Sequence, residues 1–470
     1  MEEKKVLLSI RDLDVKFRVR GRILTAIRNV SLDIYENETI AIVGESGCGK
    51  SVLTKTFAGT LDNNGYIDHG DIIFNDESLK ELSFPLTASA KRYITGQTEK
   101  LNRWTGAKGT LTEKDRMRNK KLAKEMYMSL CRYDAFRRPF LDRRLGNAFR
   151  TAIAGGADLD DEKTLRDIFE TAVFRVSCTG ETENELLGTS YLNMAKVNCI
   201  TDWTDIRGNK IATIFQDPMT SLNPILTIGD QISSVIIRHQ HVSETEARKR
   251  SIELMRKVGI PNPEIRYDDY PFQYSGGMRQ RIVIAIALSC QPKILICDEP
   301  TTALDVTIQA QIIRLIKDLQ RDLGFTTVYI THDLGVVANV AERVAVLYAG
   351  QIVELGTVED IFYEPKHPYT WALLSSLPQL TEKGTELFSI PGTPPSLYNK
   401  IVGDAFAPRN NYAMAIDLKE EPPMFQVSET HFAKTWLLDP RAPKTEAPKN
   451  IQNLHEKMVK IYGDFEEEGE

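Results

Sequence analysis

Glycines, a lysine and a serine follow a short apolar run near the N-terminus. The run is Thr39 to Val43, and the eight residues after it are Gly44, Glu45, Ser46, Gly47, Cys48, Gly49, Lys50 and Ser51. They fit the pattern G-x-x-x-x-G-K-[ST] between a strand and a helix, which we expect over residues 51–59 and which includes Val52. Glycines let successive N–H groups point at phosphate oxygens, Lys50 reaches the β- and γ-phosphates, and the Ser51 hydroxyl ligates Mg²⁺. The segment predicts a nucleotide phosphate loop.

An acidic pair ends a second apolar run. Residues 293–297 read Lys-Ile-Leu-Ile-Cys, and Asp298 and Glu299 follow directly. Acids at the carboxyl end of a buried parallel strand lie beside the phosphate loop in such sheets. We expect Asp298 to hold Mg²⁺, directly or through water, and Glu299 to orient and deprotonate the attacking water. The alternative is a strand that ends in surface acids without a chemical role.

A second anion-binding pattern lies between these two segments. Ser275, Gly276 and Gly277 enter a helix that we expect over residues 282–290. A hydroxyl, two permissive backbone positions and a positive helix end suit phosphate. One ATP cannot readily use two phosphate cradles of the same domain, so the second pattern indicates a nucleotide held elsewhere.

With these segments in this order, the sequence resembles the ATP-binding cassette (ABC) ATPases. In that family the Ser-Gly-Gly element, here with Gln280, reaches across to the ATP held by a partner. The resemblance implies that Gln216 senses Mg²⁺ and the attacking water, and that Asp305 lies in the loop spanning two active sites. It also implies that His332, which follows the strand 327–331, contacts the γ-phosphate. Phe17 lies where the family places an aromatic that stacks on adenine.

The resemblance implies an α/β fold with a mixed central sheet of the P-loop type. We expect a nucleotide-binding domain over residues 1–83 and 202–352, with an N-terminal antiparallel β-region and a helical subdomain at about 226–286. An inserted, partly helical module should occupy 84–201. A C-terminal accessory region should follow over 353–440, and a polar tail with a short helix, 451–462, over 441–470.

Three segments are similar to the ATPases of oligopeptide and dipeptide importers: residues 214–224, 363–370 and 390–395. The resemblance implies ATP and Mg²⁺ as ligands and pairing with a second, related ATPase. It also implies two transmembrane permease subunits and, indirectly, an extracytoplasmic peptide-binding protein, with this chain at the cytoplasmic face of the membrane. Some relatives carry nickel or other small solutes, so that alternative stays open. So does a soluble ABC ATPase without a transport role, although the chain has one cassette and no long heptad insertion.

The C-terminal region departs from the family in one respect. Many members carry cysteines there that can hold an iron–sulfur cluster. Aligned on Gly403 to Asn410, those positions hold Asp404, Asn410, Asp417 and Thr435. Such clusters are held by thiolates, so we expect none here.

The insertion after the β-hairpin expected over residues 70–82 is strongly divided in charge. Residues 91–150 carry 17 Lys and Arg against 6 Asp and Glu, whereas residues 151–200 carry 4 against 9. Helical patterns cover 113–130 and 162–174. We expect a small folded module that contributes nothing to the phosphate cradles and whose basic half faces its own acidic half, the partner ATPase or lipid headgroups. The alternatives left open are a solvated excrescence, a docking site for a partner subunit, and contact with lipid or nucleic acid.

Charge, hydropathy and cysteine spacing indicate the protein's partners, its cellular location and the state of its thiols. The net charge of −6 makes nucleic-acid binding by the whole protein unlikely. No apolar run reaches 18 residues, and the first residues lack a signal-peptide pattern, so we expect a cytosolic protein. The six cysteines have no paired spacing and are expected to be free thiols.

Overall fold

The computed structural model describes residues 4–75, 82–107, 109–133, 135–190, 192–196, 203, 206–217, 221–300, 306–376, 390–448 and 451. The chain divides into two compact units. The first consists of Met1–Lys5, Arg11–Gly70 and Cys199–Glu470, and the second of Val6–Ile10 and Asp71–Asn198. The expected tail helix over 451–462 lies outside the described residues, apart from Ile451.

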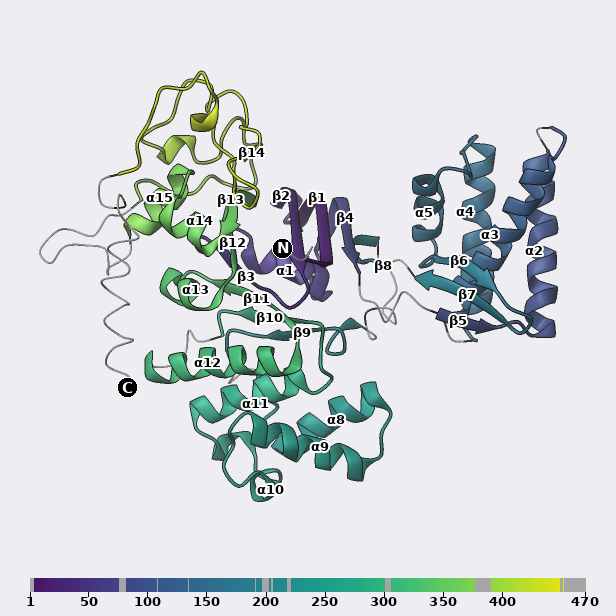
Figure 1. The fold of residues 1–470 in the computed structure, drawn as a ribbon, viewed down its shortest axis with the longest axis horizontal. Helices are drawn as coiled ribbons and strands as arrows, with labels where there is room; N and C mark the ends of the chain where they lie inside the picture. The colour runs from purple at the N-terminus through teal and green to yellow at the C-terminus, as the bar shows by residue number, and fades with distance from the viewer. Residues whose placement is uncertain are drawn as a thin grey trace, which may run out of the picture. The chain divides into compact units, whose positions relative to one another are not determined.

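The first unit is built on a mixed eight-stranded sheet (Figure 1). In spatial order its strands are β14 (Phe425–Gln426), β15 (Phe432–Ala433), β13 (Gln351–Thr357), β12 (Arg343–Tyr348), β3 (Thr39–Val43), β11 (Thr326–Thr331), β10 (Ile294–Asp298) and β9 (Ile211–Ile214). The five strands from β12 to β9 are parallel, whereas β13, β14 and β15 pair antiparallel. The mixed α/β sheet expected from the sequence is confirmed.

The core strands of this sheet align the ends that carry the chemistry. All five residues of β3 and all six of β11 are buried, which fits their continuous apolar and β-branched character. Val43 pairs with Thr331, and Ile330 pairs with Asp298. The carboxyl ends of β3, β11 and β10 therefore lie at one edge, where ligands bind in open parallel sheets.

Helices follow these strands or form a separate helical group. Those of the first unit are α1 (Lys50–Ala58), α8 (Ile228–Gln240), α9 (Glu244–Lys257), α10 (Pro263–Arg266), α11 (Gly276–Leu288), α12 (Val306–Leu323), α13 (Leu334–Val340), α14 (Val358–Tyr363) and α15 (Pro368–Ser375). Figure 1 shows α8 to α11 gathered on the β9 side of the sheet. No helix among the described residues has the length and apolar character needed to cross a membrane.

Helix α11 begins earlier than the sequence predicts. The expected start was residue 282, but the helix starts at Gly276, with the Ser275 side chain accepting a hydrogen bond from Met278 N–H. Ser275 is thus the N-cap, and the two glycines form the first turn. Helix α1 starts at Lys50 and ends where Gly59 adopts a left-handed φ of 67°, close to the expected bounds.

A smaller sheet has the order β2 (Arg22–Tyr35), β1 (Val6–Val19), β4 (Gly65–Phe74), β8 (Leu192–Asn193). The expected hairpin over residues 70–82 is wrong. Strand β5 (Leu82–Pro85) pairs with β7 (Glu185–Ser190), and β8 takes the place beside β4. The partner strands come from about 100 residues further along the chain, so no local turn signal reveals them.

The second unit has its own core. It contains α2 (Ala88–Gly106), α3 (Glu113–Cys131), α4 (Arg138–Ala154), α5 (Glu162–Glu170) and a three-stranded sheet of order β5-β7-β6, with β6 at Val176–Glu181. Buried apolar side chains from all four helices form one cluster, with Phe149 and Phe169 in edge-to-face contact at 5.3 Å. A continuous core of this kind shows a folded module and excludes a loose linker.

One sequence expectation for this module needs amendment, and several of its elements were not predicted. Helix α5 ends at Glu170 and not at residue 174. Ala172, Val173 and Phe174 lie beyond its end and are buried. Helices α2 and α4 and the three-stranded sheet were not predicted. The expected pairing of the basic half with the acidic half is confirmed in part, since Lys114 and Arg118 pair with Asp160 and Lys124 pairs with Glu181.

Candidate nucleotide site

The phosphate loop runs from the end of β3 into α1 and depends on its glycines. A Cβ on Gly44 would lie 2.2 Å from Leu347 O, so only glycine allows this approach to β12. Gly47 has φ of 79°, a conformation that L side chains rarely adopt. Ser46 and Gly47 are exposed at the loop tip, Cys48 is buried, and Val52 is half-buried in the first turn of α1.

Lys50 points into the loop. Its side chain is buried at 6% exposure, and Nζ donates to Gly44 O at 2.8 Å and to Glu45 O at 2.9 Å. A buried ammonium requires such acceptors or an anion. The loop carbonyls hold the Lys50 ammonium group in the phosphate loop, where its N–H groups can also donate to phosphate oxygens. The residues present therefore fit a nucleotide phosphate group.

Ser51 and Asp298 meet at the aligned strand ends. Ser51 Oγ donates to Asp298 Oδ1 at 3.0 Å. Burial raises the pKa of the Asp298 carboxyl above its usual range, while the Ser51 hydrogen bond acts in the opposite direction. A hydroxyl and a desolvated carboxylate oxygen beside the phosphate loop are suitable ligands for Mg²⁺.

Glu299 lies at the centre of a three-residue contact. Gln216 Nε2 donates to Glu299 Oε2 at 2.9 Å, and His332 Nδ1 lies 3.1 Å from Glu299 Oε1. The structure thus brings together three residues predicted to be catalytic, although they lie on three separate segments. Glu299 has φ of 47°, which is rare for a residue other than glycine, and its N–H donates to Ile330 O at 2.9 Å. The backbone turns sharply at the end of β10 and aims this carboxylate at the strand ends.

The position of His332 is set by the start of α13. Asp333 caps this helix, with Oδ1 accepting from Gly335 N–H at 2.9 Å. The His332 side chain is 61% exposed, so it is accessible to a ligand. When Nδ1 carries the proton, it donates a hydrogen bond to the Glu299 carboxylate.

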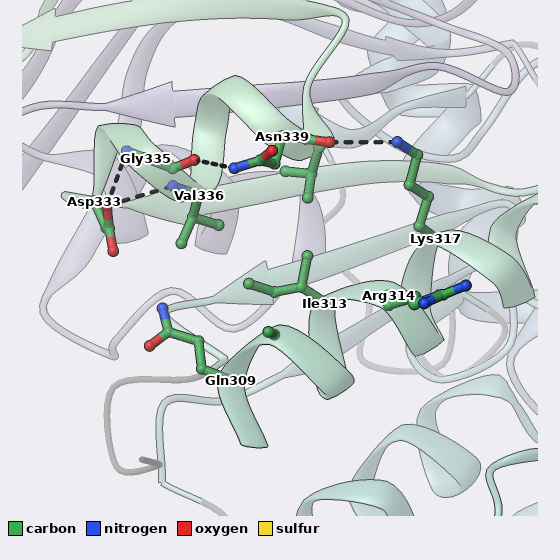
Figure 2. Close-up of a pocket in the computed structure, with 10 residues that line it drawn as sticks. Gln309, Ile313, Arg314, Lys317, Asp333, Gly335, Val336 and Asn339 are labelled. Carbon is green, nitrogen blue, oxygen red and sulfur yellow. Dashed lines mark hydrogen bonds between the residues drawn. The ribbon is translucent and has the colours of Figure 1, made fainter. Parts of the chain in front are cut away.

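A surface pocket of about 630 Å³ flanks this segment (Figure 2). It lies between α12 and α13 and is lined by Gln309, Arg314 and Lys317 on one side and by Asp333, Val336 and Asn339 on the other. Lys317 Nζ donates to Asn339 O across it at 3.3 Å. None of the predicted site residues lines this pocket, so it is a surface feature beside the histidine segment and not the phosphate cradle.

The Ser-Gly-Gly element is at the surface. Ser275 and Gly276 are exposed and Gly277 is half-buried. Gln280 differs from them, because its side chain is completely buried and Nε2 donates to Pro300 O at 2.7 Å. Through this bond Gln280 links α11 to the segment after Glu299, and its contact with nucleotide stays a prediction.

Phe17 and Asp305 complete the predicted site residues. Phe17 is 8% exposed, and a Cβ on Gly65 would lie 2.7 Å from its ring. The ring packs within the N-terminal β-region, and adenine stacking on it stays a prediction. Asp305 lies outside the described residues.

Two residues at the phosphate loop were not predicted. Glu45 N–H donates to Tyr369 Oη at 2.8 Å, and Arg409 Nη1 donates to Glu45 Oε2 at 2.7 Å. Tyr369 belongs to the 363–370 segment that is similar to the family, and Arg409 to the segment on which the cysteine positions were aligned. Nothing in their spacing reveals the contact, because Arg409 lies 364 residues from Glu45.

The four positions aligned with cluster cysteines carry polar side chains that bond to nearby backbone groups or lie partly buried. Asp404, Asp417 and Thr435 are buried, and Asn410 is half-buried. Asp404 Oδ1 accepts from Phe406 N–H, Asp417 Oδ2 accepts from Met414 N–H, and the Thr435 hydroxyl accepts from Leu437 N–H. Two carboxylates, an amide and a hydroxyl do not fit an iron–sulfur cluster, which is held by thiolates. The five described cysteines form no disulfide.

Comparisons with known proteins agree with this geometry. A family model described as "ABC transporter" matches residues 27–157 and 179–302. A model described as "Oligopeptide/dipeptide transporter, C-terminal region" matches residues 353–416.

Curated relatives match along nearly the whole chain. The oligopeptide transport ATP-binding protein AmiE of Streptococcus pneumoniae is 48% identical over 98% of both chains. The dipeptide transport ATP-binding protein DppD of Lactococcus lactis is 42% identical over 99% of this chain and 100% of its own. The oligopeptide transport ATP-binding protein OppD of Bacillus subtilis is 41% identical over 98% and 96%. Taken with the phosphate loop, the aligned strand ends and the Glu299 contacts, these matches place the chain in the ABC transporter family of ATP-binding proteins.

Proposed function

We propose that this chain binds and hydrolyses ATP and thereby powers the uptake of oligopeptides or dipeptides through an ABC importer. The observation that carries the proposal is the contact of Glu299 with both Gln216 and His332 beside the Ser51–Asp298 pair. Peptide as the transported solute is supported by the relatives named above and by the match over residues 353–416.

Each residue has a distinct role in the proposed reaction. Lys50 and the N–H groups of the phosphate loop bind the β- and γ-phosphates. Glu299 accepts a proton from the attacking water, which Gln216 helps to orient. His332 donates to the Glu299 carboxylate through Nδ1 and contacts the γ-phosphate. The rigid turn at Glu299 keeps its carboxylate within reach of both partners.

Ser51 and Asp298, with Gln216, would hold Mg²⁺. The donor set of one hydroxyl, one carboxylate and one amide suits a small hard cation that keeps several waters. When bound, Mg²⁺ neutralises charge that develops on the phosphate oxygens.

The exposed Ser275, Gly276 and Gly277 imply that a second, related ATPase completes each site. We assign the nucleotide-binding domain to residues 1–83 and 202–352, with Phe17 as the adenine platform and Asp305 in the loop between the two sites. Two permease subunits would anchor the pair at the cytoplasmic face of the membrane. An extracytoplasmic binding protein would deliver peptide.

Reconstitution tests this proposal. The chain is purified with its second ATPase and two permeases, placed in proteoliposomes, and assayed for ATP-dependent uptake of a labelled pentapeptide and a labelled dipeptide. Uptake of either, abolished in the Lys50→Ala variant, supports the proposal. If nickel or another small solute stimulates ATP hydrolysis and no peptide is taken up, the assignment of peptide as the transported solute is wrong. If no integral membrane subunit co-purifies with the chain, the transport role is wrong.

A further inference from the structure

The C-terminal region contacts the phosphate loop at one residue, Glu45, through two independent contacts. Tyr369, in α15, accepts a hydrogen bond from the Glu45 N–H at 2.8 Å. Arg409 pairs with the Glu45 carboxylate through both Nη atoms, at 2.7 Å and 3.0 Å. One contact fixes the backbone of the loop and the other fixes its side chain. Because Glu45 O also accepts from Lys50 Nζ at 2.9 Å, the anchored residue is in direct contact with the phosphate-binding lysine.

Arg409 is suited to hold this position. Its side chain is 5% exposed, and Nε donates to Pro391 O at 2.8 Å. Nη1 also donates to Tyr348 Oη at 3.2 Å. The planar guanidinium therefore joins the loop, β12 and the 390–391 segment in one fixed geometry, which a lysine cannot reproduce.

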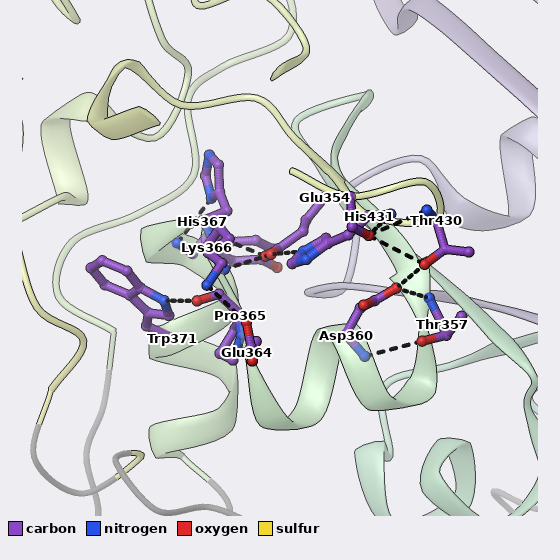
Figure 3. A network of polar contacts seen from close by, with 12 residues as sticks. Glu354, Thr357, Asp360, Glu364, Pro365, Lys366, His367, Trp371, Thr430 and His431 are labelled. Atoms are coloured by element: carbon purple, nitrogen blue, oxygen red, sulfur yellow. Dashed lines mark hydrogen bonds and ion pairs between the residues drawn. The ribbon is translucent and has the colours of Figure 1, made fainter. Parts of the chain in front are cut away.

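Tyr369 is held just as firmly. It is completely buried, with ring centroids 4.5 Å from Tyr348 and 5.3 Å from Phe406. The start of its helix is fixed by a polar network around Glu354 (Figure 3). The buried Glu354 carboxylate accepts from Lys366 N–H at 2.6 Å and from His367 N–H at 3.1 Å.

The same network includes the other end of the C-terminal region. His431 Nε2 lies 2.8 Å from Glu354 Oε1 (Figure 3), and Glu354 is on β13, next to β15. A buried carboxylate with this many partners holds β13, β15 and α15 in one arrangement. The placement of Tyr369 at the phosphate loop thus depends on the packing of β13, β15 and α15.

We propose that Arg409 and Tyr369 are positioning residues that hold the phosphate loop in its nucleotide-binding shape, so that the C-terminal region sets the affinity for ATP. Neither residue is assigned to contact ATP. The inference rests on the proposed nucleotide binding and adds a task for residues 353–440.

Binding of a fluorescent ATP analogue to the full chain tests the proposal. Tyr369→Phe removes one hydrogen bond and should raise Kd about 3- to 10-fold. Arg409→Gln removes a bidentate pair and should raise Kd roughly 10- to 100-fold, with Arg409→Lys between wild type and Arg409→Gln. In the assembled transporter, KM for ATP should rise with Kd while kcat changes much less. Combining Glu45→Gln with Arg409→Gln should raise Kd by less than the product of the single effects.

Arg441→Gln is the matched control. Arg441 directly follows the C-terminal region and pairs with Asp439, but its side chain is 84% exposed. Its removal should leave Kd unchanged. A general loss of folding would reduce the number of binding sites while the remaining protein keeps the wild-type Kd.

Folded Arg409→Gln or, should that variant fail to fold, folded Tyr369→Phe with a Kd within twofold of wild type would overturn the proposal. Failure of the wild-type chain to bind the analogue at all would instead overturn the proposed nucleotide site, and this inference with it. The two failures are distinguished by the wild-type measurement alone.

Discussion

Glu299 is the residue whose role the local geometry defines most narrowly. Its left-handed backbone and its two side-chain partners leave the carboxylate little freedom. An amide at this position has the same size and shape as the carboxylate, but it cannot accept a proton from water.

We expect Glu299→Gln to retain ATP binding and to slow hydrolysis by roughly 10²–10⁴, the range for loss of a general base. Gln still accepts from one neighbour, so the loop and its neighbours should keep their positions. Phosphate release by the assembled transporter and binding of an ATP analogue measure the two effects separately. Glu36→Gln, at a surface carboxylate near Lys5, is the control and should turn over normally. Near-normal hydrolysis by Glu299→Gln would remove Glu299 from the mechanism.

Asp404 gives a pH-dependent prediction. Burial raises the pKa of its carboxyl to about 6. The folded protein therefore holds this proton more tightly than the unfolded chain, so stability falls as pH rises from about 4 to about 6. Asp404→Asn keeps an acceptor for Phe406 N–H and removes the charge. The variant should match wild type near pH 4 and be more stable at pH 7.5, by up to about 3 kcal/mol.

Melting temperatures at pH 4.5 and pH 7.5 measure this difference. Asp439→Asn is the control, because Asp439 is partly exposed and Arg441 lowers the pKa of its carboxyl to about 2. The melting temperature of that variant at pH 7.5 should not exceed that of the wild type. An equal loss of stability by Asp404→Asn at both values would show that the hydrogen-bond geometry, and not the charge, dominates at this position.

At the scale of elements, the inserted module has a core of its own, whereas β8 belongs to the sheet that contains β4. The helices α2 to α5 and the sheet β5-β7-β6 share one core. Strand β8 instead pairs with β4, and the buried Asn193 donates to Asp71 Oδ1 at 2.7 Å and accepts from Ile72 N–H at 3.1 Å. A deletion that includes β8 would leave these groups of β4 without their partner.

We expect a variant in which residues 82–190 are replaced by a short Gly/Ser linker to fold and to bind ATP within a few-fold of wild type. Retaining Leu192–Asn193 keeps the β4 pairing. The same deletion extended through Asn198 is the matched comparison and should be less stable. Circular dichroism, thermal melting and binding of the ATP analogue report on both. Loss of nucleotide binding in a folded 82–190 deletion would assign the module to the site.

At the scale of the whole molecule, the Ser-Gly-Gly element is exposed while the phosphate loop lies at the strand ends. This arrangement fits an element that acts on a nucleotide bound by another subunit. We expect Ser275→Arg and Gly277→Asp to leave ATP binding by this chain largely intact and to abolish hydrolysis at the partner's site. Trapping of labelled nucleotide on each subunit tests this. A bound structure in which one nucleotide contacts Lys50 and Ser275 of the same chain would contradict it.

The purified whole chain should contain no iron–sulfur cluster, because Asp404, Asn410, Asp417 and Thr435 supply no thiolate. Iron analysis and visible absorption of protein purified without oxygen check this. A variant with cysteine at all four positions, grown with iron, serves as a comparison. Stoichiometric iron in the wild-type protein, lost on chelation, would contradict the prediction.

The sequence by itself determined the local chemistry. Strand β3, helix α1, the end of β10 and the histidine after β11 lie close to their expected positions, because each is encoded by a continuous run of apolar, glycine and capping residues. The local patterns predicted the phosphate loop and the Asp298–Glu299 pair, whereas Gln216 and His332 were predicted as members of the same site from the resemblance to the ABC ATPases.

Only the tertiary structure decided which distant segments support that site. The pairing of β5 with β7, of β8 with β4, and of Arg409 with Glu45 joins residues far apart in the chain. Such contacts depend on how completed elements pack, and a short β-strand or a single arginine carries no local signal of its partner. The buried Gln280 shows the same limit, since the periodicity of α11 gives a helix but not the atom that its side chain meets.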